Sequence, residues 1–349
     1  MGLQALVRAS NGQFFAVRLS SWAVFLAAWS VSIDLALANP PKGIRRSKHP
    51  AILYGVKFNA GTSVSRPPVA MRHAGENPES AKFNIKFTGD FPEDAKAPFR
   101  AAAAIWSALL TSRVPIEIEA NWTSLGQFGP SGIVLGSTHV WLWNSDHAPT
   151  PLQSNTWYPT ALANKYVGND VDGTSPDMHV DLNSDVKNWY FGTDGLTPLG
   201  QFDFMSVVLN QLAHGLGFSG SMTVNAAGVG SFGVAGNGDP AIFDTMVQGD
   251  VGSLSDGINV ANPSPELGTQ LQAHNVYLKG NATTKACGGG TALLYSPLPW
   301  KQGSSYVHLD EFAYPPGNVN SLMTPSIGWA EPIHNPGPIV LGVLMDIGW

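Results

Sequence analysis

The clearest hydrophobic pattern of the chain covers residues 202–220. Apolar side chains recur there every three or four residues, the period of an amphipathic helix; they are Phe204, Val207, Val208, Leu212 and Leu216. Asp203 stands at an N-cap position, and Gly217 stands where a helix ends in a left-handed residue. The pattern predicts a helix in which positions 210 and 214 lie one turn apart on the same face.

Shorter patterns predict a sheet around this helix. Residues 83–87 and 114–120 alternate apolar and polar side chains, and an amphipathic stretch at about 95–111 lies between them. Strand, helix and strand in that order favour a parallel pair joined by a helical crossover. Further candidate strands lie at 132–136, 140–143 and 178–182, and Pro338 begins a C-terminal helix over 337–346. We therefore expect an α+β fold with a mixed sheet.

Composition excludes some classes of function. The 349 residues include 19 Lys and Arg against 25 Asp and Glu, a formal net charge of -6. A weakly acidic chain of this kind lacks the basic surface that nucleic-acid binding requires. Gly and Pro are abundant, at 38 and 26 residues, which predicts many loops. We expect residues 221–304 to be mostly irregular.

The first 38 residues have the pattern of a secretory signal peptide. Arg8 and Arg18 precede the apolar run 22–33, and Ala36-Leu37-Ala38 forms a cleavage site. The run is shorter than the roughly 20 residues that span a bilayer, although an uncleaved anchor is the alternative interpretation. We expect a secreted or periplasmic protein with no membrane attachment after cleavage. Residues 39–80 are polar and Pro-rich, which predicts an irregular extension.

Candidate chemistry lies on the central helix. In zinc peptidases, two His at helix positions i and i+4 bind the metal, and a Glu between them is the general base: His-Glu-x-x-His. This chain has Asn210-Gln211-Leu212-Ala213-His214 at that spacing. The frame of the motif is present, but two of its three functional groups are replaced.

Flanking residues carry a resemblance to a known family. Ala213-His214-Gly215-Leu216-Gly217-Phe218 resembles the second half of the metzincin motif, although Gly220 stands where most metzincins have a third zinc-binding His. The leishmanolysin-like branch takes that ligand from far downstream, and His308 followed by Leu322-Met323-Thr324-Pro325 is similar to its distal His and Met-turn.

The resemblance implies a metzincin-like, two-lobed zinc-peptidase fold. It implies an upper lobe at 81–220 with the active-site helix, and a lower lobe at 221–349 with the distal His, the Met-turn and a C-terminal helix. It also implies a zinc site at His214, His308 and the position of Asn210, above Met323.

The substitutions predict loss of hydrolysis. Gln211 cannot accept the proton of an attacking water, and losing a general base costs about 10²–10⁴-fold in rate. The amide of Asn210 is a poorer zinc ligand than imidazole. His214 and His308 then form either a weakened zinc site or a hydrogen-bonded pair. For His334 two interpretations stay open: it approaches this site, or it belongs to a turn. The leading hypothesis is an exported pseudopeptidase that binds a peptide or protein.

Three alternatives stay open. An active zinc metalloendopeptidase requires a substitute base, for which Asp310 and Glu311 beside His308 are candidates. A carbohydrate-binding or adhesive module would use aromatic side chains that stack on sugars; the candidates are Trp141, Trp143, Trp157 and Trp189. The alternative interpretation is that these Trp side chains are buried in the core. A calcium site would use hard carboxylate ligands, for which the candidates are Asp172, Asp177, Asp181 and Asp185.

Overall fold

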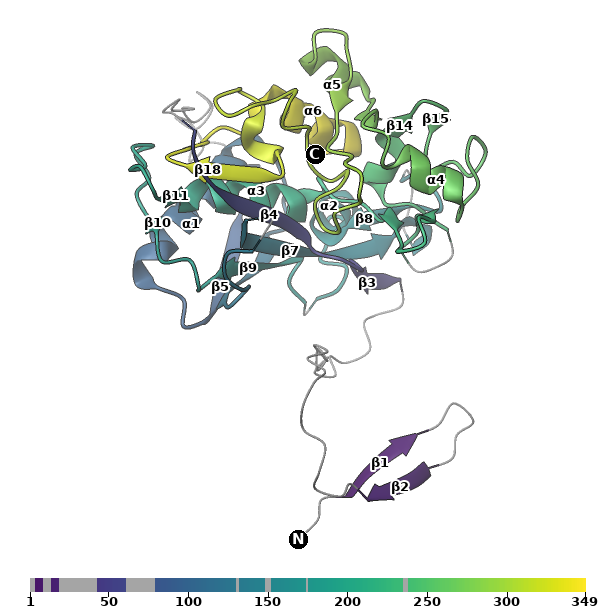
Figure 1. Ribbon diagram of the computed structural model, residues 1–349, viewed down its shortest axis with the longest axis horizontal. Helices are drawn as coiled ribbons and strands as arrows, with labels where there is room; N and C mark the ends of the chain where they lie inside the picture. The colour runs from purple at the N-terminus through teal and green to yellow at the C-terminus, as the bar shows by residue number, and fades with distance from the viewer. Residues whose placement is uncertain are drawn as a thin grey trace. The chain divides into compact units, whose positions relative to one another are not determined.

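A mixed eight-stranded sheet organises residues 40–349 (Figure 1). In this computed structural model the sheet has the order β18-β4-β7-β9-β6-β5, and β3 and β8 also pair with β7. The strands are β3 (Ile44–Arg46), β4 (Ala51–Asn59), β5 (Phe83–Gly89), β6 (Ile116–Thr123), β7 (Ile133–Asn144), β8 (Trp157–Pro159), β9 (Met178–Asn183) and β18 (Ser326–Trp329). Strands β5, β6 and β9 are mutually parallel, and β7 is antiparallel to both β9 and β4.

The structure describes residues 4–8, 14–18, 43–60, 79–129, 132–147, 152–173, 175–234 and 238–349. The chain divides into two compact units, Met1–Asn39 and Pro40–Trp349. In the first unit, β1 (Gln4–Arg8) and β2 (Phe14–Arg18) form an antiparallel pair. The apolar run and cleavage site of the predicted signal peptide lie outside the described residues. No helix in the described ranges is both long and apolar enough to cross a membrane.

Six α-helices occur in the described part of the chain: α1 (Glu93–Leu109), α2 (Thr160–Val167), α3 (Phe204–Leu216), α4 (Pro265–Gln270), α5 (Asn281–Ala286) and α6 (Gly337–Ile347). Helix α3 packs against α1 and against β7, β4 and β9. The Trp106 Nε1 on α1 donates a hydrogen bond to the Leu209 carbonyl on α3, at 3.1 Å. Every residue of α3 is buried, so the predicted central helix lies inside the hydrophobic core.

The α+β prediction is confirmed. Strands β5 and β6 are parallel and α1 connects them, as the alternating pattern and the crossover rule indicate. The two strands expected at 132–136 and 140–143 are one continuous strand, β7. The C-terminal helix is α6, with Pro338 in its first turn.

The prediction of an irregular extension over residues 39–80 is wrong for residues 44–59. Strand β4 lies inside the sheet, antiparallel to β7 and parallel to β18, and Figure 1 shows it between them. Ala51 and Leu53 are buried, whereas Ile52 and Tyr54 on the opposite face are partly exposed. The alternation is that of a strand, but the Pro-rich flanks conceal it. Residues 61–78 lie outside the described part.

The segment after α3 contains more structure than expected. A small sheet of order β15-β14-β16-β17 and helices α4 and α5 lie within residues 247–293. The remaining short elements are β10 (Trp189–Tyr190), β11 (Phe202–Asp203), β12 (Thr223–Val224), β13 (Gly230–Ser231), β14 (Val247–Gly249), β15 (Gly252–Ser253), β16 (Tyr277–Leu278), β17 (Ala292–Leu293), and the 3₁₀ helices η2 (Ser145–His147), η3 (Ile242–Met246) and η4 (Ser321–Met323). The division into lobes at residue 220 stays a prediction. Strand β4 precedes both ranges and pairs with β7 of the first and with β18 of the second.

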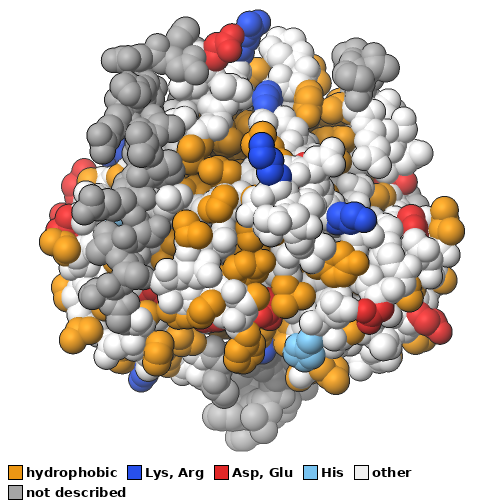
Figure 2. All heavy atoms as spheres, turned by 90° about the horizontal axis from the view of Figure 1, so that it is seen from above, with side chains coloured by type: hydrophobic (Ala, Val, Ile, Leu, Met, Phe, Trp, Pro, Cys, Tyr) orange, Lys and Arg blue, Asp and Glu red, His pale blue; other side chains and the backbone are white. Residues whose placement is uncertain are grey.

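The surface reflects the low charge of the chain. Figure 2 shows one face on which hydrophobic side chains are scattered among uncharged ones, with few charged groups. Charged residues make up 13% of the sequence. Such a face has no single-sign field to steer a highly charged partner.

Candidate functional site

Helix α3 begins and ends at the residues that the sequence predicts. The Asp203 carboxylate accepts a hydrogen bond from the Ser206 backbone N–H at 2.8 Å, so it is an N-cap. Gly217 ends the helix with φ +122°, a conformation that disfavours residues with a Cβ atom. The helix therefore presents positions 210, 211 and 214 in the register that the sequence predicts.

The amides of Asn210 and Gln211 bind each other and the surrounding backbone. Asn210 Nδ2 donates to the Leu322 carbonyl at 2.9 Å and lies 3.4 Å from Met323 Sδ, while its Oδ1 accepts from Gln211 Nε2 at 2.9 Å. Gln211 Oε1 accepts from the Thr138 hydroxyl on β7 at 2.7 Å. Both side chains are fully buried. The two amides thus form a satisfied buried network in which no group can take a proton at neutral pH.

His214 and His308 meet through their Nε2 atoms, which lie 3.2 Å apart. His214 Nδ1 lies 2.8 Å from the Phe218 carbonyl oxygen, and His308 Nδ1 lies 2.9 Å from the Ser304 carbonyl oxygen. A carbonyl oxygen only accepts, so each Nδ1 carries the hydrogen. In the neutral rings both Nε2 atoms therefore carry lone pairs, and these two lone pairs face each other.

Burial keeps both rings neutral. Each is fully buried, and desolvation lowers the pKa of His308 to about 4. Desolvation also lowers the pKa of His214 well below its ordinary value, and the neighbouring His308 adds to this effect. At neutral pH the pair consequently holds two unshared lone pairs without a proton between them.

This geometry fits two ligands of a tetrahedral metal ion. Zinc–imidazole bonds of about 2.0–2.1 Å at a tetrahedral angle separate the two nitrogens by about 3.3 Å. Metal-binding His rings characteristically donate their other N–H to a carbonyl or carboxylate, as both rings do here. Among the described residues, no group of three or more His, Cys, Asp and Glu side chains could hold a metal ion. The two rings therefore fit half of a zinc site, with the Asn210 amide as the neighbouring polar group.

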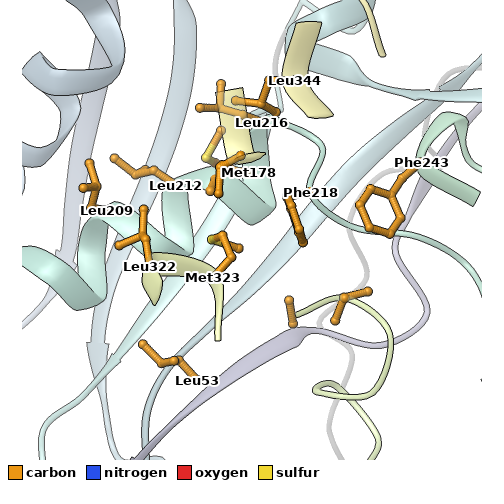
Figure 3. Close-up of a cluster of buried hydrophobic side chains, with 14 of the residues drawn as sticks. Leu53, Met178, Leu209, Leu212, Leu216, Phe218, Phe243, Leu322, Met323 and Leu344 are labelled. Carbon is orange, nitrogen blue, oxygen red and sulfur yellow. The ribbon is translucent and has the colours of Figure 1, made fainter. Parts of the chain in front are cut away.

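Met323 packs beside the central helix. Figure 3 shows Met323 and Leu322 of η4 in one hydrophobic cluster with Leu209 and Leu212 of α3 and Leu53 of β4. The thioether contacts the Asn210 amide. Side-chain contacts thus join Asn210 to Gln211 and Met323, and a separate contact joins His214 to His308.

The site is closed rather than open to a groove. All five side chains are completely buried. Strand β4 contributes to this burial: Ala51 pairs with Thr138, whose hydroxyl binds Gln211, and Leu53 lies in the cluster of Met323 (Figure 3). The opposite edge of β4 is also paired: Ile52 N–H donates to the Gly303 carbonyl and Tyr54 N–H to the Pro325 carbonyl. Residues 51–54 therefore lie as an extended segment between β7 and the segments that flank His308 and Met323.

The other candidate residues lie outside this cluster. His334 Nε2 is 2.9 Å from Asp203 Oδ1, so His334 belongs to the capping network of α3. Asp310 accepts from the backbone N–H groups of residues 312 and 313, and Glu311 Oε2 accepts from the Ser326 hydroxyl at 2.6 Å. Both candidate substitute bases are thus committed to local contacts.

Three of the four Asp side chains considered for calcium have hydrogen-bond partners of their own. Asp177 accepts from the Glu117 N–H and the Asn164 amide. Asp181 binds Asn121 and His179, and Asp185 binds the Ser124 hydroxyl. Burial raises the pKa of Asp172 to about 8 and that of Asp177 to about 7. The structure does not bring these four carboxylates together.

Three of the four Trp residues considered for sugar stacking are buried. Trp143, Trp157 and Trp189 are 6%, 3% and 9% exposed. Trp141 is partly buried and packs on the core. Their rings therefore contribute to the core, which was the alternative interpretation of these residues.

Sequence reasoning missed a buried network beside the site. Asp244 is fully buried and accepts from the Ser221 and Tyr306 hydroxyls and from the Ala241 N–H. Burial raises its pKa to about 6. Tyr306 has φ +57° and lies two residues before His308. No local sequence signal marks this network, because Ser221, Asp244 and Tyr306 are far apart in the chain.

Comparison with known proteins gives one partial match. A family model described as SPBPB7E8-like matches residues 93–227, which include α1, β6, β7, β9 and α3 but less than half of the chain. No characterised protein and no solved structure matches the chain.

Proposed function

We propose that this chain is an exported, leishmanolysin-like metzincin homologue that binds polypeptide and does not hydrolyse it. The observation that carries the proposal is the Gln211 amide, fixed between the Thr138 hydroxyl and the Asn210 amide at the position of the general base. A neutral, fully buried amide can orient neighbours but cannot remove a proton from water.

The surroundings of the site support loss of hydrolysis. The rings of His214 and His308 have no exposed surface, and β4 pairs with β7 beside Thr138, whose hydroxyl binds Gln211. The carboxylates nearest in sequence to His308 are occupied, Asp310 by backbone N–H groups and Glu311 by Ser326. Neither of these two carboxylates is therefore placed as a substitute for the missing base.

A residual metal role is compatible with the histidine pair. If zinc binds, His214 and His308 would hold it through Nε2, with the Asn210 amide oxygen as a third neutral donor. Bound zinc would supply a cross-link between α3 and the segment 304–308, and it would remove the repulsion of the two facing lone pairs. Because Asn210 replaces an imidazole, we expect binding at least about 10–100-fold weaker than in an intact site.

The polypeptide class of ligand is supported by the way this chain holds its own β4. The segment 51–56 is extended and is bound on both edges by backbone hydrogen bonds, which is the mode of β-strand addition. Export is supported by the signal-like pattern of residues 1–38.

The test compares the wild type with Asn210→His/Gln211→Glu and with Gln211→Glu alone. Zinc retained after dialysis is measured by mass spectrometry, and cleavage of casein is measured with and without chelator. We expect no chelator-sensitive cleavage by the wild type, and tighter zinc retention by the double variant than by Gln211→Glu. Zinc retention is the main readout, because β4 covers the site in either variant.

Chelator-sensitive cleavage by the wild type would overturn the proposal. Equal zinc retention by the double variant and Gln211→Glu would show that position 210 is not a metal-ligand position, and would remove the resemblance on which the peptidase homology rests. Urea unfolding of each variant checks that the buried substitutions leave the protein folded.

A further inference from the structure

A pocket lies on the face of β4 that points away from the buried histidines. Its volume is about 360 Å³, and its walls come from β4, from residues 295–304, from residues 311–312 and from the start of β18. The side chains that matter for the argument are Tyr54, Tyr295, Lys301, Glu311, Phe312 and Ser326. The pocket is separate from the site described above but is connected to it, because Tyr295 N–H donates to the His308 carbonyl.

The wall at Glu311 carries a carboxylate whose hydrogen-bond partner is an uncharged hydroxyl. Ser326 Oγ donates to Glu311 Oε2 at 2.6 Å, and this hydroxyl neutralises no charge. Burial raises the pKa of Glu311, the Asp310 carboxylate raises it further, and the Lys301 ammonium lowers it only partly. A desolvated carboxylate of this kind gains more from an entering cation than an exposed one does.

The other walls are aromatic. Tyr54 and Tyr295 line the pocket, and Phe312 is 97% exposed at its edge. An aromatic side chain left in water at a pocket edge can cover the aliphatic part of a ligand. Together with Glu311, these rings suit a ligand that is apolar along its length and positively charged at its end.

This chain already places one ammonium group against these walls. Lys301 Nζ lies 5.6 Å from the ring centroid of Tyr295, within the range of a cation–π contact. The Lys301 residue is exposed, so its flexible side chain can turn into solvent when another cation enters. The contact shows which chemistry the walls accept.

We propose that this pocket binds the cationic side chain of a Lys or Arg residue presented by a polypeptide partner. The aliphatic stem lies against Tyr54, Tyr295 and Phe312, and the ammonium or guanidinium group pairs with Glu311. Glu311 gives the pocket the charge that is complementary to such a side chain. The inference rests on the proposed polypeptide-binding function and names the feature of the partner that is recognised.

The experiment measures binding of three acetylated, amidated pentapeptides by calorimetry. They have the form Ala-Ala-X-Ala-Ala, where X is Lys, norleucine or Glu. The protein variants are Glu311→Gln, Lys301→Met and Phe312→Ala, with Glu266→Gln on α4 as a matched control that removes a carboxylate outside the pocket.

We expect the wild type to bind the Lys peptide in preference to the other two. Glu311→Gln should weaken this binding about tenfold or more, because the charge is lost while the hydrogen bond with Ser326 is retained. Phe312→Ala should weaken it less, and Glu266→Gln should leave it unchanged. Lys301→Met should strengthen binding of the Lys peptide, because this substitution removes a competing ammonium group.

The sign of the Lys301→Met effect is decisive. Loss of binding in Lys301→Met together with tighter binding in Glu311→Gln would mean that the pocket accepts anions, and would overturn the proposal. Equal binding of the Lys and norleucine peptides, or no binding at millimolar concentration, would also overturn it. These outcomes are independent of the casein and zinc measurements, so the two proposals fail separately.

Discussion

Acid should destabilise this protein through His308. In the folded state the pKa of His308 is about 4, whereas an exposed His titrates at about 6.5. The unfolded chain therefore binds more protons than the folded chain between these values. The stabilising effect of a neutral, buried His308 is complete above pH 6.5 and is lost progressively as the pH falls toward 4.

The magnitude follows from the difference between the two pKa values. A difference of about 2.5 units corresponds to a total of about 3 kcal/mol below pH 4, of which about 2 kcal/mol is already lost at pH 5. His214 acts in the same direction, because its pKa is also lowered by burial. Carboxylates with raised pKa values, such as Asp177 and Glu331, act in the opposite direction over the same range.

A comparison of variants isolates the histidine term. Urea unfolding at pH 7 and pH 5 is measured for the wild type and for His308→Leu, in which position 308 cannot be protonated. The carboxylate terms are common to both proteins and cancel in the difference. His274→Asn is the control, because His274 is exposed and its φ of +55° is accessible to Asn.

The wild type should lose about 2 kcal/mol more than His308→Leu between pH 7 and pH 5. The control should lose as much as the wild type. Equal losses in the wild type and His308→Leu would refute the reasoning, because His308 would then titrate alike in the folded and unfolded chains.

Two further substitutions test how the site is supported. Leu53→Ala should lower the free energy of unfolding by about 2–5 kcal/mol, because it empties space between β4 and Met323. Ile52→Ala, on the other face of β4, should lower it less. Equal losses of stability in urea unfolding would show that β4 does not seal the site. Asp203→Ala should cost about 2–3 kcal/mol, because it removes the N-cap of α3 and the partner of Thr197 and His334; a loss below about 1 kcal/mol in thermal unfolding would contradict this role.

Local patterns were sufficient to predict α3 and its caps. Asp203, the apolar repeat and Gly217 lie within one short segment, and their effects on a helix do not depend on distant parts of the chain. The positions of Asn210, Gln211 and His214 follow directly from the helix. His308 lies 94 residues from His214 in sequence, and only the family resemblance linked the two.

Strand β4 could not be predicted in the same way. Its alternation of buried and half-exposed residues is clear once β7 and β18 flank it, but its neighbours in sequence are polar and Pro-rich. This strand contributes to the closure of the site, so the burial of the site could not be predicted either. The pocket at Glu311 could not be predicted from local patterns either, because its walls come from four separate segments of the chain.

The position of β4 has a consequence for the order in which this protein folds. Tyr54 pairs with Ser326, so one edge of β4 stays without its strand partner until a segment about 270 residues later has been synthesised. Contacts of such long sequence separation form late, because chain entropy must be lost before they stabilise the fold. Until that segment is present, β7 is the only strand that pairs with β4 in the main sheet, so the sheet is completed only near the end of synthesis.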